Sequence, residues 1–290
     1  MQRDGDVNEK NLLLAKKPFI LVWVINVINM TLARTETLFG MIIRPKTIYI
    51  WFTFPDEIQD EKLLAEYLKI LPSAELEQLT KYHHIKHQHR FLIGRVLTRS
   101  VLSSCTGIPP GSLLFSKNSY GRPLLQSEQS SSIRFNLSYT EGLVALALVS
   151  GQEVGIDVEN TRIDIDCLGI AEQYFSQSEL NDLVRLPQEL LKERFFEYWT
   201  LKESYVKAKG LGLSIPLNAF SFKLCTDDCD RITLTPLPKK KSEFWQFKLL
   251  NPSPDHKAAL SVTLENKSHY EVSVKKMVPL RSENHFPQSF

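Results

Sequence analysis

The sequence predicts an α+β fold made of two subdomains that meet near residue 150. Two observations carry this prediction. Apolar residues recur at helical spacing over 57–71, 87–105 and 189–209, and short apolar or β-branched runs bounded by turn residues indicate strands in both halves. Each half therefore holds helices and a few strands, which we expect to be antiparallel. At 290 residues the chain can bury one sizeable core or two modest ones.

The first part of the chain opens with a strand that ends at Pro55. Ser73 is placed to cap a helix, because it follows a proline and precedes acidic residues in the first turn. The elements expected here are a strand, three helices and a short strand, at 47–54, 57–71, from Ser73 onward, 87–105 and 112–116. A turn over 118–123 and a polar surface loop over 124–132 follow.

The middle of the chain carries strand patterns at 133–138, 143–149 and 154–159. The tetrapeptide 150–153 predicts a turn, so we expect the last two strands to form a β-hairpin. Beyond it, helices are predicted over 164–185 and 189–209, the second ended by Gly210. Strands are then predicted at 219–224, 232–234, 244–249, 258–262 and 270–274.

The first 40 residues are expected to lie outside the fold. Two lysines precede an apolar run over 18–28, which is shorter than the roughly 20 residues that span a bilayer. The run is similar to the start of a signal peptide, but no small-residue cleavage site follows, and Met41 is an alternative start. We therefore divide the chain into an extension (1–40), an N-terminal subdomain (41–150), a C-terminal subdomain (151–278) and a loose polar tail (279–290). Deleting residues 1–40 should leave activity intact.

Composition excludes several classes of function. A net charge of +2 is too small for non-specific nucleic-acid binding by bulk electrostatics, and no membrane span is predicted. The cysteines form no CxxC pair, so we expect reduced thiols and a cytoplasmic protein rather than a zinc site or a disulfide framework. They are Cys105, Cys167, Cys225 and Cys229.

Two carboxylates alternate with apolar residues on the predicted strand 154–159. Side chains two positions apart on a strand point the same way, so Asp157 and Glu159 project together, opposite Ile156 and Val158. Such a pattern is also typical of the solvated face of an edge strand, and the strand alone does not decide between the two interpretations.

The helix over 189–209 favours the functional interpretation. Glu203 and Lys207 lie one turn apart and continue a face that begins with Phe196 and Trp199. A solvated Glu–Lys pair is the plain alternative, but two large aromatic residues indicate a covered face, where charges need partners or a metal. Magnesium takes oxygen ligands and leaves positions for water and phosphate, so Asp157, Glu159 and Glu203 suit it.

Three stretches in order resemble the Sfp-type 4′-phosphopantetheinyl transferases. They are 133–139, 154–159 and 195–213, with a weaker likeness from 89–94 through 121–123. The resemblance covers about 41–265. It implies two similar α+β halves related by a pseudo-twofold axis, each a small antiparallel sheet packed with helices, with coenzyme A between them.

The resemblance also implies the reaction and its residues. A monomer would move the 4′-phosphopantetheine arm of coenzyme A to a serine of an acyl or peptidyl carrier protein and release adenosine 3′,5′-bisphosphate. Asp157, Glu159 and Glu203 would hold Mg²⁺, and Lys207 would add positive charge near the phosphates. Glu203 is the candidate base, with a water or a relay through Glu159 as the alternatives.

Coenzyme A contacts are implied at five positions, which are Lys86, Lys117, Arg122, Ser138 and Tyr139. Lys86 lies in a basic stretch, 81–90, that would ordinarily be a solvated surface. His83 and His87 in that stretch could imitate a metal site but have no third ligand. Tyr139 departs from the family, which commonly has histidine there. Tyrosine donates a hydrogen bond to phosphate but carries no positive charge, so coenzyme A affinity is expected to be lower or differently arranged.

Two other functions compete with transfer. A non-catalytic module that binds carrier proteins would explain Tyr139, although every acidic metal position is kept. An unrelated Mg²⁺-dependent nucleotide hydrolase would need a glycine-rich phosphate loop such as GxxxxGK[ST], which the sequence lacks.

Overall fold

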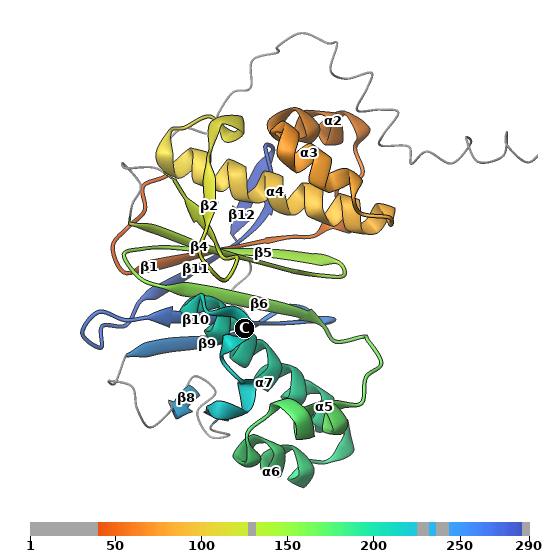
Figure 1. The fold of residues 1–290 in the computed structure, drawn as a ribbon, viewed down its shortest axis with the longest axis vertical. Helices are drawn as coiled ribbons and strands as arrows, with labels where there is room; N and C mark the ends of the chain where they lie inside the picture. Colours follow the sequence, from red (N-terminus) through yellow and green to blue (C-terminus); the bar gives the residue numbers. More distant parts are fainter. Residues whose placement is uncertain (1–39, 127–131, 225–231, 236–243, 286–290) are drawn as a thin grey trace, which may run out of the picture.

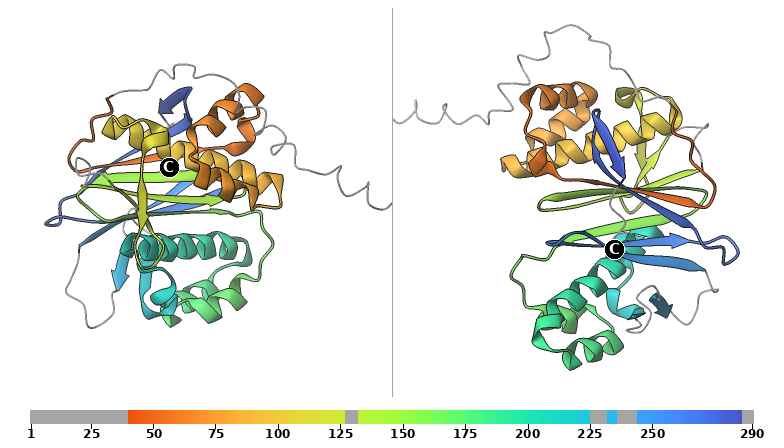
Figure 2. Two further views of the ribbon diagram at one scale, coloured as in Figure 1. Left: turned by 45° about the horizontal axis from the view of Figure 1, so that its top comes forward. Right: turned by 180° about the vertical axis from the view of Figure 1, so that it is seen from behind.

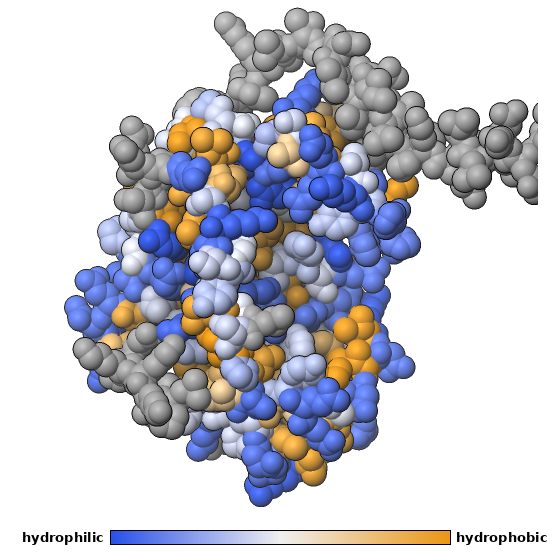
Figure 3. Space-filling model, viewed as in Figure 1, coloured by the Kyte–Doolittle hydropathy of each residue, from blue (hydrophilic) through white to orange (hydrophobic). Residues whose placement is uncertain are grey.

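The computed structural model describes residues 40–126, 132–224, 232–235 and 244–285. These residues form four layers, with helices outside and two sheets facing each other in the middle (Figure 1). Figure 2 shows the same layers from two further sides. On the face shown in Figure 3, hydrophilic side chains dominate and apolar ones lie in several small groups. Within the described ranges, no helix has the length and apolar content needed to cross a membrane.

The first sheet has five strands in the order β12-β11-β1-β5-β4. All seven residues of its central strand are buried, because both faces of that strand are covered. The strands are β1 (Thr47–Thr53), β4 (Ile133–Thr140), β5 (Leu143–Ser150), β11 (Glu271–Val278) and β12 (Ser282–His285). β11 runs parallel to β1, so this sheet is mixed rather than antiparallel.

Helices cover the outer face of the first sheet. The longest is α4 (Ile85–Thr106), which ends at Gly107 with a left-handed φ of 73°. The shorter elements are η1 (Pro55–Glu57), α2 (Glu61–Ile70), α3 (Ser73–Thr80) and η2 (Pro110–Ser112). A two-stranded ribbon follows, made of β2 (Phe115–Lys117) and β3 (Pro123–Leu125), where a plain loop was predicted from residue 124.

The second sheet has three antiparallel strands in the order β6-β10-β9. They are β6 (Val154–Asn160), β9 (Trp245–Ser253) and β10 (His256–Thr263). Its outer face carries α7 (Gln188–Lys209), with α5 (Cys167–Tyr174) and α6 (Gln177–Arg185) beside it. The small elements are η4 (Gly212–Ser214), η5 (Leu217–Ala219), β7 (Ser221–Leu224) and β8 (Ile232–Thr235). Each half therefore repeats one plan, a sheet covered by a 22-residue helix.

A middle core joins the two sheets. Ile48, Ile50 and Phe52 of β1 pack with Ile156 and Val158 of β6 in one buried cluster. Separate clusters lie under the outer helices of each half. The fold class predicted from sequence is confirmed, and the two halves meet face to face through apolar side chains.

The predicted hairpin between β5 and β6 is wrong. β6 pairs with β10 in the second sheet, and β5 pairs with β1 and β4 in the first. The turn at Gly151, whose φ is 75°, carries the chain from one sheet to the other. Both strands are apolar on the face that lines the middle core, so sequence alone fits either arrangement.

The predicted loose tail is also wrong as far as it is described. β12 occupies Ser282–His285, and Tyr67 donates a hydrogen bond of 2.8 Å to the carbonyl of Pro279. The helix predicted over 164–185 is two helices, because Ser176 begins α6 with a capping box. The extension over 1–39, Cys225, Cys229 and the last five residues lie outside the described residues.

Candidate functional site

Gly155 brings helix α7 directly onto strand β6. A Cβ atom at this position would lie 2.5 Å from the backbone nitrogen of Ala208 and would overlap with the carbonyl oxygen of Ser204. Only glycine allows this approach. The two elements that carry the predicted acidic residues are therefore in backbone contact.

Asp157 and Glu159 point toward α7, as the alternation predicted. Ile156 and Val158 face the middle core instead. Asp157 is only 4% exposed, so its carboxylate is not on a solvated edge. The covered helix face predicted from Phe196 and Trp199 is confirmed by this packing.

Three elements meet at the Asp157 carboxylate. Lys207 of α7 donates to Asp157 Oδ1 at 2.6 Å and to Ser138 Oγ at 2.8 Å. The Ser138 hydroxyl of β4 donates to the same Oδ1 at 3.1 Å. A partly buried cation from α7, a buried hydroxyl from β4 and a buried carboxylate from β6 thus form one polar cluster, which lies where the two halves of the chain meet.

The other two carboxylates have raised pKa values. Burial, reinforced by the negative charge of Asp157, raises the pKa of Glu159 to about 7, against the opposing effects of the Trp199 hydrogen bond and Lys207. Burial and Asp157 likewise raise the pKa of Glu203, and Lys207 opposes the shift. Three carboxylates repel one another here without enough positive charge to balance them.

The cluster has the chemical features of a divalent-cation site. Asp157 Oδ2 is buried and has no hydrogen-bond partner in the described structure. Carboxylate oxygens that are buried or partly buried, mutually repelling and in one case unpaired fit a hard cation such as Mg²⁺. Among the described residues, however, no three ligating side chains already converge into a metal-binding group. In the described structure Lys207 is the cation that contacts Asp157.

The predicted contacts Lys86 and Lys117 lie on the surface. Lys86, in the first turn of α4, pairs with Glu141 at 3.1 Å, and both side chains are mostly exposed. Lys117 ends β2 and is exposed. His83 precedes α4, so it does not share a helical face with His87.

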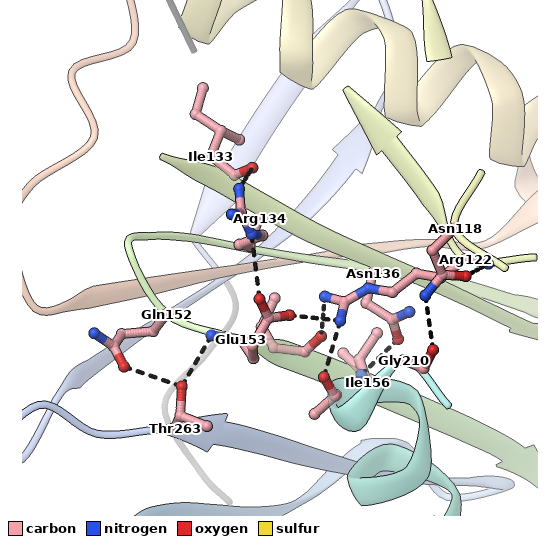
Figure 4. Close-up of polar contacts among 12 residues, drawn as sticks. Asn118, Arg122, Ile133, Arg134, Asn136, Gln152, Glu153, Ile156, Gly210 and Thr263 are labelled. Atoms are coloured by element: carbon pink, nitrogen blue, oxygen red, sulfur yellow. Dashed lines mark hydrogen bonds and ion pairs between the residues drawn. The ribbon is translucent and has the colours of Figure 1, made fainter. Parts of the chain in front are cut away.

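Arg122 ties the β2–β3 ribbon to the second half of the chain (Figure 4). Its Nη1 atom donates to Glu153 Oε2 at 2.6 Å and to the carbonyl of Ala208 at 2.8 Å, and Nη2 donates to the carbonyl of Val154 at 3.2 Å. Asn118 adds a hydrogen bond of 2.7 Å to the carbonyl of Gly210. With its terminal nitrogens engaged, Arg122 has a structural role here, and its predicted contact with the nucleotide stays a prediction.

Arg90 lies beside Tyr139, a predicted coenzyme A contact, and sequence reasoning did not single it out. Its guanidinium lies over the ring of Tyr139, 5.1 Å from the ring centroid, and makes no ion pair with any residue in the described part of the chain. Tyr139 is 45% exposed and follows Ser138 on β4. Arg90 therefore brings a positive charge to the position where the family commonly has histidine. Arg90 belongs to the basic stretch 81–90, whose composition predicts a solvated surface, so the sequence did not indicate its contact with Tyr139.

Comparison with known proteins decides the family. Residues 153–263 match the 4′-phosphopantetheinyl transferase superfamily, and residues 59–150 match the N-terminal part of a 4′-phosphopantetheinyl transferase. The chain is 33% identical over 179 residues to the transferase Sfp of Bacillus subtilis, which covers 61% of this chain and 77% of that protein. This chain belongs to the 4′-phosphopantetheinyl transferase family.

Two further proteins similar to this transferase are also 4′-phosphopantetheinyl transferases. It is 38% identical over 168 residues to the transferase gsp of Aneurinibacillus migulanus, a match covering 57% of this chain and 67% of that protein. It is 35% identical over 157 residues to the transferase HetI of Nostoc sp., covering 54% of this chain and 66% of that protein. The predicted family is confirmed, and with it the enzyme class.

Solved structures with likeness to the transferase are holo-(acyl-carrier-protein) synthases. The Thermotoga maritima protein is 21% identical, with a TM-score of 0.32, over 40% of this chain and 64% of that one. The Bacillus anthracis protein, described in complex with CoA (3′,5′-ADP), is 19% identical, with a TM-score of 0.33, over 38% of this chain and 94% of that one.

Proposed function

We propose that this transferase moves the 4′-phosphopantetheine arm of coenzyme A to a serine hydroxyl of an apo acyl or peptidyl carrier protein. Adenosine 3′,5′-bisphosphate leaves, and Mg²⁺ is required. We propose further that the enzyme acts as a cytoplasmic monomer. The observation that carries the proposal is the cluster of the buried Asp157 and the partly buried Glu159 and Glu203, which face Lys207 and Ser138. The names of the relatives support the same reaction.

The charges of the cluster suit a pyrophosphate substrate. Mg²⁺, held by Asp157, Glu159 and Glu203, would supply charge neutralisation at the pyrophosphate. Lys207 would contribute a second positive charge, and the Ser138 hydroxyl a hydrogen bond. Arg90 on Tyr139 would provide a further cation for a phosphate group of coenzyme A. Lys86, Lys117 and Arg122 remain proposed contacts on the strength of the resemblance.

Glu203 is the proposed base for the carrier serine. In the metal-free protein its raised pKa favours acceptance of a proton, and binding to Mg²⁺ would lower that basicity. Glu159, with a pKa of about 7, could serve as a relay if Glu203 is held by the metal. Either carboxylate must come within about 2.6–3.2 Å of the serine hydroxyl, directly or through one water.

The test is the intact mass of an apo carrier protein incubated with the transferase, coenzyme A and Mg²⁺. We expect a gain of one phosphopantetheine arm, lost when EDTA removes the metal. Asp157→Ala and Glu203→Ala should each lower the rate at least about 100-fold, the scale of a lost catalytic group, while circular dichroism stays native. Wild-type turnover in either variant would refute the assignment of the metal site.

A carrier protein that binds without gaining mass would refute transfer and favour the non-catalytic module. The nucleotide hydrolase alternative is set aside, because the chain belongs to the transferase family.

A further inference from the structure

Trp199 makes a polar contact with one of the proposed metal ligands. Its indole N–H donates a hydrogen bond of 3.2 Å to Glu159 Oε1. No other described side chain or backbone group forms a hydrogen bond or an ion pair with the carboxylate of Glu159. The orientation of this carboxylate therefore depends on the indole.

Aromatic side chains hold the indole ring in place. Phe195 stacks on it, with centroids 5.9 Å apart and an interplanar angle of 21°. Tyr174 meets it edge-on at 6.1 Å, and Phe175 packs against it at 6.3 Å. Phe195 and Phe175 are buried, so the ring has little freedom to turn. A donor fixed in this way also fixes its acceptor.

The hydrogen bond makes the two carboxylate oxygens of Glu159 different from each other. Oε1 is taken by the indole, and Oε2 makes no hydrogen bond with a described residue. A glutamate at the end of a strand has three side-chain torsions, and fixing them in advance lowers the cost of ordering the ligand when metal binds. The nearby carboxylates of Asp157 and Glu203 repel Glu159, so it needs such a restraint.

We propose that Trp199 is a positioning residue, whose indole N–H orients the Glu159 carboxylate for a divalent cation. This inference rests on the proposed function, because it takes Glu159 as a ligand. It adds a polar role to a residue whose ring is otherwise part of the core beneath α7. The buried rings of Phe175 and Phe195 then support the metal site as well as the core, whereas Tyr174 is 46% exposed and meets the indole only edge-on.

The experiment measures Mn²⁺ binding by electron paramagnetic resonance of the free ion, in the presence of coenzyme A. Trp199→Phe removes the N–H donor and keeps an aromatic ring. We expect its Mn²⁺ affinity to fall about 10–100-fold, the usual effect of losing a residue that orients a metal ligand. At saturating Mg²⁺ its kcat should return close to the wild-type value, because the defect is in loading the metal.

Two controls separate orientation from packing. Tyr174→Leu removes a ring that touches the indole but keeps the donor, and its Mn²⁺ affinity should stay within about threefold of wild type. In a Glu159→Ala background, which lacks the acceptor, Trp199→Phe should have no further effect on Mn²⁺ affinity, because the two residues act through one contact. Thermal unfolding is measured for every variant.

The outcomes are distinct. Wild-type Mn²⁺ affinity in Trp199→Phe, or an equal loss in Tyr174→Leu, would overturn the inference and leave the proposed function standing. No Mn²⁺ binding by the wild-type protein would overturn the metal site of the proposed function itself, and this inference with it.

Discussion

Glu159 is an acid whose surroundings oppose its ionised form. Burial is the largest cause, the charge of Asp157 is the second, and together they raise its pKa from 4.5 to about 7. Because the folded-state pKa is raised, the neutral form stabilises the fold at low pH, and this stability is lost as the pH rises through about 7. A cation bound to the carboxylates would reverse that loss.

We therefore expect the metal-free protein to lose stability between pH 5 and pH 8 relative to the Glu159→Gln variant, which does not titrate at this position. Metal affinity should rise over the same interval, since the ionised form is the ligand. Thermal unfolding in EDTA at the two pH values checks the first expectation, and Mn²⁺ titration checks the second. A constant stability difference between the two proteins would contradict a pKa near 7.

Tyr139 carries no positive charge itself, but its ring holds the cationic side chain of Arg90. The Arg90 guanidinium lies over its ring, in a cation–π contact of a kind worth about 0.5–1 kcal/mol at exposed sites. We expect Tyr139→Leu to raise the KM for coenzyme A roughly 2–5-fold, which is that free energy expressed as an affinity. Tyr139→Phe keeps the ring face and should leave the KM unchanged. Steady-state kinetics with varied coenzyme A distinguishes the two variants, and equal effects of the two substitutions would show that the contact of Arg90 with the ring does not contribute to coenzyme A binding.

At the scale of elements, the site depends on how closely α7 lies against β6. Gly155 permits the contact, and the Ser204 hydroxyl forms a buried hydrogen bond of 2.7 Å with Ser261 of β10. Lys202 anchors the opposite side of the helix. It is fully buried, pairs with Glu179 at 2.7 Å and donates to the carbonyls of Leu217 and Phe220. The helix is thus held on both sides, and the positions of Glu203 and Lys207 follow.

Gly155→Ala should separate the helix from the strand. The new methyl group would overlap backbone atoms, which cannot turn aside as a side chain can. We expect a loss of about 3 kcal/mol in the free energy of unfolding, at the upper end of overpacking effects, together with loss of transfer activity. Gly94→Ala in α4 is the matched control, because its added Cβ would meet Leu137 at an ordinary 3.5 Å. Urea unfolding of both variants makes the comparison, and equal stabilities would show that α7 can move away at little cost.

At the scale of the whole molecule, the C-terminal part of the chain completes the N-terminal sheet. β11 forms a parallel pair with β1 from Thr47 opposite Glu271 onward. Thr53 donates a hydrogen bond of 2.9 Å to the carbonyl of Met277. The two halves are also tied by Arg122 and by the hydrogen bond of 2.8 Å between His256 and the Glu141 carbonyl. The subdomains therefore share strands and are not separable pieces of chain.

Truncation after residue 265 should prevent folding, because it removes β11 and β12 and exposes one edge of the central strand β1. We expect an aggregated product or one without a cooperative unfolding transition, seen by size-exclusion chromatography and calorimetry. Truncation after His285 is the control, since it removes no described element. A soluble, cooperatively folding chain of residues 1–265 would show that β11 is dispensable.

The sequence by itself determined most of the elements and which residues are proposed for the site. Apolar spacing located α4 and α7 to within two residues, and the alternation through Asp157 and Glu159 set which face of β6 is acidic. Those features are local, because strand and helix periodicity depend on neighbours a few residues away. The order of three motifs then predicted the family.

Only the tertiary structure decided how the elements pair. β5 and β6 are both apolar toward the middle core, so nothing local distinguishes a hairpin from two facing sheets. β11 pairs with β1, a strand more than 200 residues away in the sequence. The terminal nitrogens of Arg122 donate hydrogen bonds to backbone carbonyls and to Glu153. The stacking of Arg90 on Tyr139 and the bond from Trp199 to Glu159 likewise join residues of different elements. Such contacts arise from packing in three dimensions, which a one-dimensional pattern does not encode.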